Sequence, residues 1–209
     1  SLVGSEMCKE TGIGKTSAYI IAAVVWNKYQ PCDADKGFSP FIIATSSIAL
    51  QNAILEDYIP QLSQILLNEG IIAEPFEGIL RKGKGNYVCP LRLARRIESI
   101  NPDRRNKQKL DALYVLRLNM DLSKAPRLSK YDKERVAIPD TCPRKCEDAD
   151  DCAFLRMLEA QQSSTALFQV CNHNYLLADS LNRMRGYSPL LPDYRGLVVD
   201  EAHKLTAAA

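Results

Sequence analysis

The chain has 209 residues, of which 46% are hydrophobic, and a formal net charge of +2. This composition is typical of a globular domain, alone or with an insertion. The longest apolar stretch, residues 18–26, is far short of the roughly 20 residues that cross a bilayer. The chain begins without the basic and apolar regions of an export signal, so we expect an intracellular protein rather than a membrane or secreted one.

The charge is distributed unevenly along the chain. Residues 81–145 contain 18 Lys and Arg but 7 Asp and Glu, a net charge of +11, whereas the remainder is acidic. A basic segment of this kind is expected of a protein with a polyanionic partner, nucleic acid before membrane. A solvated, lysine-rich surface would have the same composition, so charge alone leaves both interpretations open.

Alternating strands and helices are predicted at both ends of the chain. We expect strands at residues 2–7, 41–45 and 197–199, and helices over 17–29 and 48–67, the latter with a kink at Pro60. This alternation predicts an α/β fold, in which a parallel sheet carries helices on both faces.

The middle of the chain has a different character. Residues 81–159 are basic, contain cysteines and lack β-branched runs, so we interpret them as an insertion between residues 1–80 and 160–209. Within this insertion we expect helices over 97–119 and 151–162 and an irregular stretch over 121–140.

A phosphate-binding loop is predicted before the first helix. The segment TGIGKT consists of Thr11, Gly12, Ile13, Gly14, Lys15 and Thr16, the functional half of a P-loop. Glycines let backbone amides wrap phosphate oxygens, Lys15 would pair with the β- and γ-phosphates, and Thr16 would place its hydroxyl on Mg²⁺. Lys9 stands where the motif has its first glycine, and a chance glycine turn before a helix is the alternative.

An acidic box follows the last predicted strand, which we expect to be buried. The segment DEAH places Asp200 and Glu201 at the carboxyl end of this strand, where open α/β sheets build their sites. Asp200 is suited to hold Mg²⁺, Glu201 to orient and deprotonate the attacking water, and His203 to report the nucleotide state. The alternative is a solvated acidic pair at a helix start. Together with the P-loop, the pair predicts an ATP-hydrolysing site.

The seven cysteines are an odd number in a chain without an export signal, which favours metal ligation or burial over disulfides. Cys142, Cys146 and Cys152 form a cluster with C-x3-C-x5-C spacing, and Cys89 lies far upstream. Four thiolates suit structural zinc as well as an iron-sulfur cluster, so the residue types do not decide between them.

With these motifs and the segments ATSSIALQ (44–51), GNYVC (85–89) and CNHNYLLAD (171–179), the chain resembles the DinG and XPD family of iron-sulfur superfamily-2 DNA helicases. It is most similar to the bacterial DinG branch. The resemblance implies an N-terminal, RecA-like motor domain interrupted by an iron-sulfur insertion, and a cytoplasmic, bacterial protein.

The resemblance also implies ligands and partners. Cys89, Cys142, Cys146 and Cys152 are expected to bind a [4Fe-4S] cluster, with Cys171 as a rival fourth ligand that the family would place in the core. Thr45, Ser46 and Gln51 match the segment that contacts single-stranded DNA, although Ser46 and Ser47 could equally cap a helix. Tyr87 and nearby basic residues could form a groove that follows the strand; these are Lys82, Lys84, Arg92, Arg95 and Arg96.

The expected function is therefore that of a fragment of an ATP-dependent DNA helicase, moving 5′ to 3′ on single-stranded DNA and unwinding forked duplexes. No sequence after DEAH supplies the second RecA-like domain that closes on ATP, so we expect little hydrolysis by this piece alone. One alternative is a metal-stapled nucleic-acid-binding module with a regulatory or vestigial nucleotide site. A second is a DEAH-box RNA helicase, which the cysteine insertion disfavours.

Overall fold

The computed structural model describes residues 13–30, 38–139, 141–142, 146, 148–162 and 165–207. These residues divide into two compact units, with boundaries after Arg81 and before Thr165. We call the described residues outside 82–164 the sheet unit and those inside it the basic unit. The strand predicted at residues 2–7 lies outside the described residues. No helix in the described ranges is long and apolar enough to cross a membrane.

The sheet unit contains a four-stranded parallel sheet with the order β2-β3-β1-β4. Its strands are β1 (Phe41–Thr45), β2 (Gly78–Arg81), β3 (Phe168–Asn172) and β4 (Gly196–Val199). The predicted α/β fold with a parallel sheet is confirmed, and β1 has the predicted bounds because its continuous β-branched run suits a strand buried on both faces.

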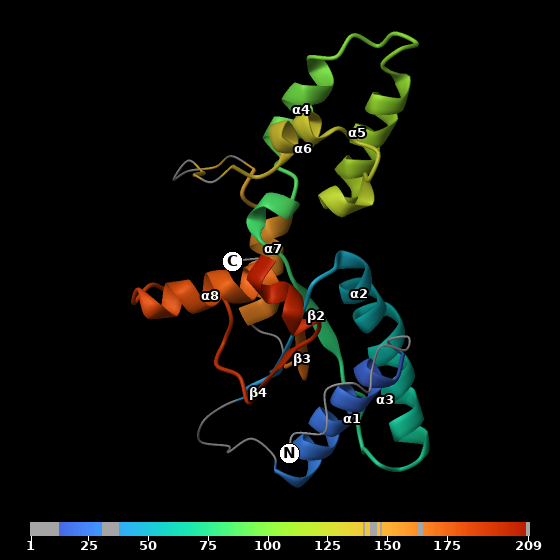
Figure 1. The fold of residues 1–209 in the computed structure, drawn as a ribbon. Coiled ribbons are helices and arrows are strands. Elements are labelled where there is room, and N and C mark those ends of the chain that lie inside the picture. The colour runs from blue at the N-terminus through green and yellow to red at the C-terminus, as the bar shows by residue number, and fades with distance from the viewer. Residues whose placement is uncertain are drawn as a thin grey trace. The chain divides into compact units, whose positions relative to one another are not determined.

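Helices cover both faces of this sheet (Figure 1). They are α1 (Ile13–Tyr29), α2 (Ile48–Ala53), α3 (Ile59–Asn68) and α8 (His173–Met184). Alternate residues of β1 point to opposite faces: Phe41 and Ile43 pack with α1 and α3, whereas Ile42 and Ala44 pack with α8. This two-sided burial explains why β1 carries no polar residue before Thr45.

The helical pattern over 48–67 forms three segments rather than one helix kinked at Pro60. A π-helical turn, η2 (Ile54–Tyr58), separates α2 from α3, and Pro60 lies in the first turn of α3. A proline is tolerated there because the first turn of a helix needs no backbone N–H partner, and the irregularity lies just ahead of it.

Three elements of the sheet unit were not predicted, namely β2, β3 and α8. The sequence of β3 is short and includes Gln169, which stays buried because its side chain accepts a hydrogen bond from Arg81 at 2.9 Å. β4 was expected to be buried, but among the described residues it lies at the edge of the sheet and Leu197 is 40% exposed.

The basic unit is built from short helices around an apolar core. They are α4 (Pro90–Glu98), α5 (Lys107–Asn119), α6 (Lys130–Val136) and α7 (Ala153–Gln162), with the 3-10 turns η3 (Lys84–Asn86) and η4 (Leu122–Lys124). Val88, Leu93, Leu113, Leu116 and Val136 are fully buried or nearly so in this core.

Two predictions for the basic unit were wrong. The helix expected over 97–119 is interrupted at residues 99–106, where Pro102 cannot continue a helix. The stretch expected to be irregular contains α6, which begins where the Ser129 side chain accepts a hydrogen bond from the Asp132 backbone amide at 3.1 Å. This serine cap is a helix-start signal that the sequence analysis overlooked.

Candidate functional site

The candidate site lies at the carboxyl edge of the parallel sheet. Asp200 directly follows β4, and its backbone amide donates to the Ala44 carbonyl of β1 at 2.8 Å. Thr45, the last residue of β1, is in register with Asn172, the last residue of β3. Strand pairing therefore places Asp200, Thr45 and Asn172 in adjacent positions along one edge, where sites of open α/β sheets are found.

The phosphate-loop segment is described in part. Thr11 and Gly12 lie outside the described residues, whereas Ile13, Gly14, Lys15 and Thr16 form the first turn of α1. Gly14 is exposed, Lys15 is half-buried and Thr16 is 2% exposed. The lysine and threonine that were expected to contact phosphate and Mg²⁺ therefore stand at the N-terminus of a helix, where the backbone amides favour anions.

Tyr19 connects α1 to the acidic box. The pKa of Tyr19 is raised to about 12, mainly by burial; the Thr16 side chain lowers it and the charge of Asp200 contributes to the rise. Tyr19 of α1 and Val198 of β4 pack against the same core cluster. The helix that begins with Lys15 and Thr16 and the strand that precedes Asp200 therefore share one core.

The acidic pair adopts an unusual backbone conformation. Glu201 has a φ of 53°, in the left-handed region that costs a residue other than glycine about 1–2 kcal/mol. Its carboxylate lies 3.3 Å from Nε2 of His203 and 3.6 Å from Nζ of Lys204. The 3-10 helix η5 (Ala202–Ala207) begins immediately afterwards, so the polypeptide turns sharply at the residue that was expected to activate water.

The junction between β3 and α8 also contacts the acidic box. Nε2 of His173 lies 2.9 Å from the backbone carbonyl oxygen of Asp200, and His173 is 2% exposed. The Asn172 side chain accepts a hydrogen bond from the Tyr175 amide at 2.7 Å, which caps α8. Sequence analysis named Asn172 and His173 only as part of a family-like segment, yet an asparagine before an apolar helix was a readable cap signal.

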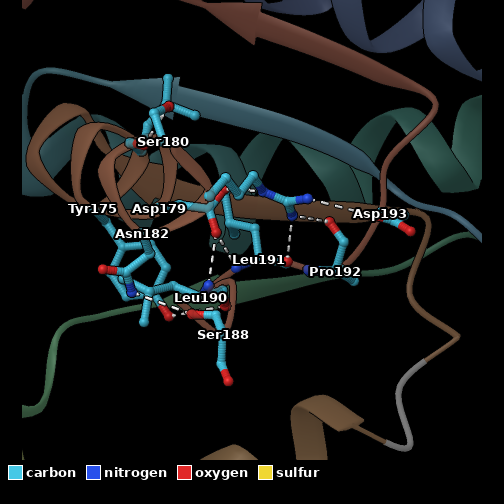
Figure 2. Close-up of polar contacts among 11 residues, drawn as sticks. Tyr175, Asp179, Ser180, Asn182, Ser188, Leu190, Leu191, Pro192 and Asp193 are labelled. Carbon is cyan, nitrogen blue, oxygen red and sulfur yellow. Dashed lines mark hydrogen bonds and ion pairs between the residues drawn. The ribbon is translucent and has the colours of Figure 1, made fainter. Parts of the chain in front are cut away.

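A buried carboxylate fixes the loop that leads from α8 to β4 (Figure 2). Oδ1 of Asp179 accepts hydrogen bonds from the amides of Leu190 and Leu191 at 2.6 and 2.8 Å, and Oδ2 accepts one from Nε of Arg183 at 2.8 Å. Arg183 also donates to the Leu191 carbonyl at 2.6 Å. We call this network the α8–β4 clamp. The bonds from Asp179 to the loop join residues 11 and 12 positions apart, so no local pattern in the sequence predicts them.

The residues expected to contact DNA differ in exposure. Thr45 and Gln51 are 0% and 1% exposed, whereas Ser46 is half-buried. Within the described part of the chain, Oγ1 of Thr45 and Nε2 of Gln51 lack a hydrogen-bond partner. Of the two serines expected as alternative helix caps, Ser47 caps α2 by accepting from the Leu50 amide at 3.1 Å.

The four candidate ligand cysteines are free thiols of the basic unit. Among the described residues, no group of three or more Cys, His, Asp or Glu side chains is arranged to hold a metal. Cys89 precedes α4, and its amide donates to the Val136 carbonyl at 2.9 Å. Cys152 precedes α7 and is joined to Cys146 through Ala149 by two backbone hydrogen bonds, of 3.1 and 3.3 Å.

The segments around these cysteines are tied together. The rings of Tyr87 and Phe154, each two residues from a candidate cysteine, have centroids 5.7 Å apart. Ile138, just ahead of the Cys142 segment, donates to the Tyr87 carbonyl at 2.9 Å. These contacts link the segments that contain Cys89 and Cys152 and lead toward Cys142. Cys171, in contrast, is fully buried in β3, and burial raises the pKa of its thiol to about 12.

Most residues of the expected strand-following groove have structural partners. Tyr87 packs on Phe154, Lys82 pairs with Asp121 at 2.8 Å, and Arg96 pairs with Asp132 at 2.6 Å. Arg95 is exposed on α4. Tyr131, which is 55% exposed, lies close to two guanidinium groups, those of Arg96 and Arg135.

Comparison with known proteins supports the resemblance drawn from the motifs. The chain is 27% identical over 214 aligned residues to the ATP-dependent helicase DinG of Mycobacterium tuberculosis, an alignment that covers 93% of this chain and 30% of that protein. It is 26% identical to the ATP-dependent DNA helicase YoaA of Escherichia coli and to that of Haemophilus influenzae, each over 93% of the chain and 29% of the relative. The predicted resemblance to DinG-type helicases is confirmed. No protein-family model matches the chain.

Proposed function

We propose that this chain is part of an ATP-dependent DNA helicase and carries half of its ATP-hydrolysing site. The observation that carries the proposal is that α1, whose first turn contains Lys15 and Thr16, packs in one core with β1 and with β4, the strand that Asp200 follows. A P-loop helix and an acidic strand end that face one region can grip a single magnesium-bound triphosphate. The names of the similar proteins support the same activity.

Each residue of the proposed site has a separate task. Lys15, with Gly14 and the other residues of TGIGKT, would bind the β- and γ-phosphates at the N-terminus of α1. Thr16 and Asp200 would hold Mg²⁺, which neutralises charge on the phosphates. Glu201 would orient the attacking water and accept its proton, and His203, 3.3 Å from the Glu201 carboxylate, would relay the state of the site.

The chain spans about 30% of the length of the curated relatives that it matches. We propose that a second RecA-like domain of the complete protein closes over ATP and supplies cationic groups that stabilise charge in the transition state. The sheet unit alone would then bind nucleotide weakly and hydrolyse it slowly. We also propose that the protein acts in the bacterial cytoplasm, where the DNA substrate of a bacterial helicase is found.

The basic unit is proposed to hold a [4Fe-4S] cluster through Cys89, Cys142, Cys146 and Cys152. Cys89 and Cys152 immediately precede α4 and α7, and the contact between the Tyr87 and Phe154 rings links their segments. The cluster would join the segments of the basic unit that contain these four cysteines. Zinc remains the competing metal because it accepts four thiolates equally well.

Single-stranded DNA and forked duplexes are the proposed nucleic-acid partners, with movement in the 5′ to 3′ direction. Ser46 is accessible for a phosphate contact, whereas Thr45 and Gln51 would contact DNA only after a rearrangement that exposes them. On the basic unit, Arg95, Arg135 and Tyr131 offer exposed cationic and aromatic groups of the kind that binds single strands.

The test is Glu201→Gln in a longer form of the protein that includes the second motor domain. We expect ATP hydrolysis to fall by at least ~100-fold, with nucleotide binding retained, because the amide keeps the shape of the side chain but cannot accept a proton. Glu69→Gln, an exposed position at the end of α3, is the matched control and should leave the rate unchanged. DNA-stimulated hydrolysis that survives Glu201→Gln would refute the proposed site. ATP would then be hydrolysed elsewhere in the protein, and the proposed site would be vestigial.

A further inference from the structure

The backbone of Asp200 is held from two directions. Its amide donates to the Ala44 carbonyl at 2.8 Å, and its carbonyl oxygen lies 2.9 Å from Nε2 of His173. A carbonyl oxygen can only accept, so Nε2 of His173 must carry the proton and donate it. The peptide between Asp200 and Glu201 is thus fixed by β1 on one side and by the start of α8 on the other.

This peptide lies at the strained point of the site. Its orientation depends on the φ of Glu201, which is 53°. Without a bond to the Asp200 carbonyl, the turn could relax toward an ordinary φ, and this rotation would swing the Glu201 carboxylate to another position. A hydrogen bond to that carbonyl therefore acts directly on the direction in which the proposed water-activating group points.

The donor is itself held rigidly. His173 is buried, it is the first residue of α8, and Asn172 before it caps that helix through the Tyr175 amide. Further along α8, the α8–β4 clamp anchors Asp179 to the loop that leads into β4. A buried imidazole on an anchored helix can hold a backbone group in one place, as an exposed side chain could not.

We infer that His173 is a positioning residue, which holds the Asp200–Glu201 peptide in its left-handed turn and thereby aims the Glu201 carboxylate at the water that attacks ATP. The inference rests on the proposed function for its catalytic meaning. Filling the core would not require a hydrogen bond from His173 to the Asp200 carbonyl, which belongs to the peptide that precedes Glu201.

The test compares His173→Phe with His173→Gln in the longer protein that includes the second motor domain. His173→Phe keeps an apolar ring but removes the donor, so we expect kcat for ATP hydrolysis to fall ~10- to 100-fold while KM changes less than ~3-fold. The glutamine amide can donate from a similar distance, so His173→Gln should restore kcat to within ~5-fold of the unmodified protein.

Leu176→Ala is the structural control. Leu176 is 5% exposed on the same helix and packs against Ile42 and Ala44 of β1, and its side chain has no hydrogen-bonding group. Its truncation should therefore lower the unfolding temperature but leave kcat within ~2-fold. Equal losses of kcat in His173→Phe and Leu176→Ala would overturn the inference, because general destabilisation would then explain both.

Hydrogen exchange on the 209-residue chain gives a second readout that needs no activity. The Lys204 amide donates to the Glu201 carbonyl at 2.8 Å, so loosening of the turn in His173→Phe should speed its exchange by ~10-fold, with less effect in His173→Gln. Unchanged exchange would overturn the inference, whatever the rate shows. Loss of hydrolysis in His173→Phe with full activity in Glu201→Gln would instead contradict the proposed function.

Discussion

The sheet unit and the basic unit are held together by different means. In the sheet unit, four parallel strands share a continuous register, and every proposed catalytic group stands at or near a strand end or a helix start. In the basic unit, short helices surround a small core, and ion pairs such as Lys82–Asp121 and Arg96–Asp132 join segments far apart in sequence. Backbone pairing can therefore define a site before any ligand binds, whereas side-chain ion pairs join the basic unit, whose described cysteines form no metal-binding group.

The largest expected effect is the loss of the metal from the basic unit. Cys142→Ser should reduce bound iron from about four atoms per chain to nearly none, because a [4Fe-4S] cluster requires four thiolates. Cys171→Ala is the matched control, since this thiol is buried in β3 and should leave iron content unchanged. Iron and zinc assays with visible absorption spectra on anaerobically prepared protein measure both. One zinc and no iron in the unmodified chain would refute the cluster.

A smaller effect is expected at the α8–β4 clamp. Asp179→Ala leaves the buried Leu191 amide and the part-buried Leu190 amide without an acceptor and removes a partner of Arg183. The free energy of unfolding of the sheet unit should therefore fall by about 3 kcal/mol. Urea unfolding followed by the fluorescence of Trp26, the single tryptophan and a residue of the sheet unit, measures this change.

Asp193→Ala is the control for the clamp. Asp193 also pairs with Arg183, at 3.2 Å, but its side chain is 93% exposed, so its loss should cost less than about 0.5 kcal/mol. If both variants lose the same stability, the burial of Asp179 has no special role.

The smallest effect is a pH dependence of the basic unit. Burial tends to raise the pKa of Asp132, but hydrogen bonds from Ser129 and Arg96 and the charges of Arg96 and Lys109 outweigh it, so the pKa is lowered. A lowered pKa in the folded state means that this carboxylate stabilises the fold above its unfolded pKa of about 3.9 and that the stabilisation is lost as the pH falls through the folded value.

Asp132→Asn should therefore lower stability by about 2 kcal/mol at pH 7 and by much less below pH 3. Circular dichroism detects the unfolding of both units, and the transition that Trp26 fluorescence does not report belongs to the basic unit. Asp111→Asn, the same change at an exposed position of α5, should shift stability by no more than about 0.5 kcal/mol at either pH. Equal pH dependence in both variants would contradict the assignment to Asp132.

Local sequence signals predicted part of the fold well. The run FIIAT predicted β1 to the residue. A short, β-branched run that follows a glycine and proline favours a buried strand over a helix, which would need a longer run. β2 and β3 were missed because GILR and FQVCN are short and contain buried polar groups that pair with each other, Arg81 with Gln169. Such pairing joins residues 88 positions apart and leaves no local pattern.

The candidate site was predictable to a similar extent. The position of Asp200 and Glu201 after a strand, and of Lys15 and Thr16 at a helix start, follows from short motifs. The contact of His173 with the Asp200 carbonyl depends on the order of the strands, which places α8 beside the acidic box. That order is a property of the folded sheet, so no motif of this length contains it.

The strand order has a consequence for how the protein is made. β1, an interior strand, pairs on both sides with strands that come from residues 168–172 and 196–199, more than 120 positions later in the chain. During synthesis, both edges of β1 lack their partner strands until the basic unit, residues 82–164, has left the ribosome. The risk of wrong pairing is greatest in that interval, which makes early folding of the basic unit, or a chaperone on FIIAT, a condition for a good yield.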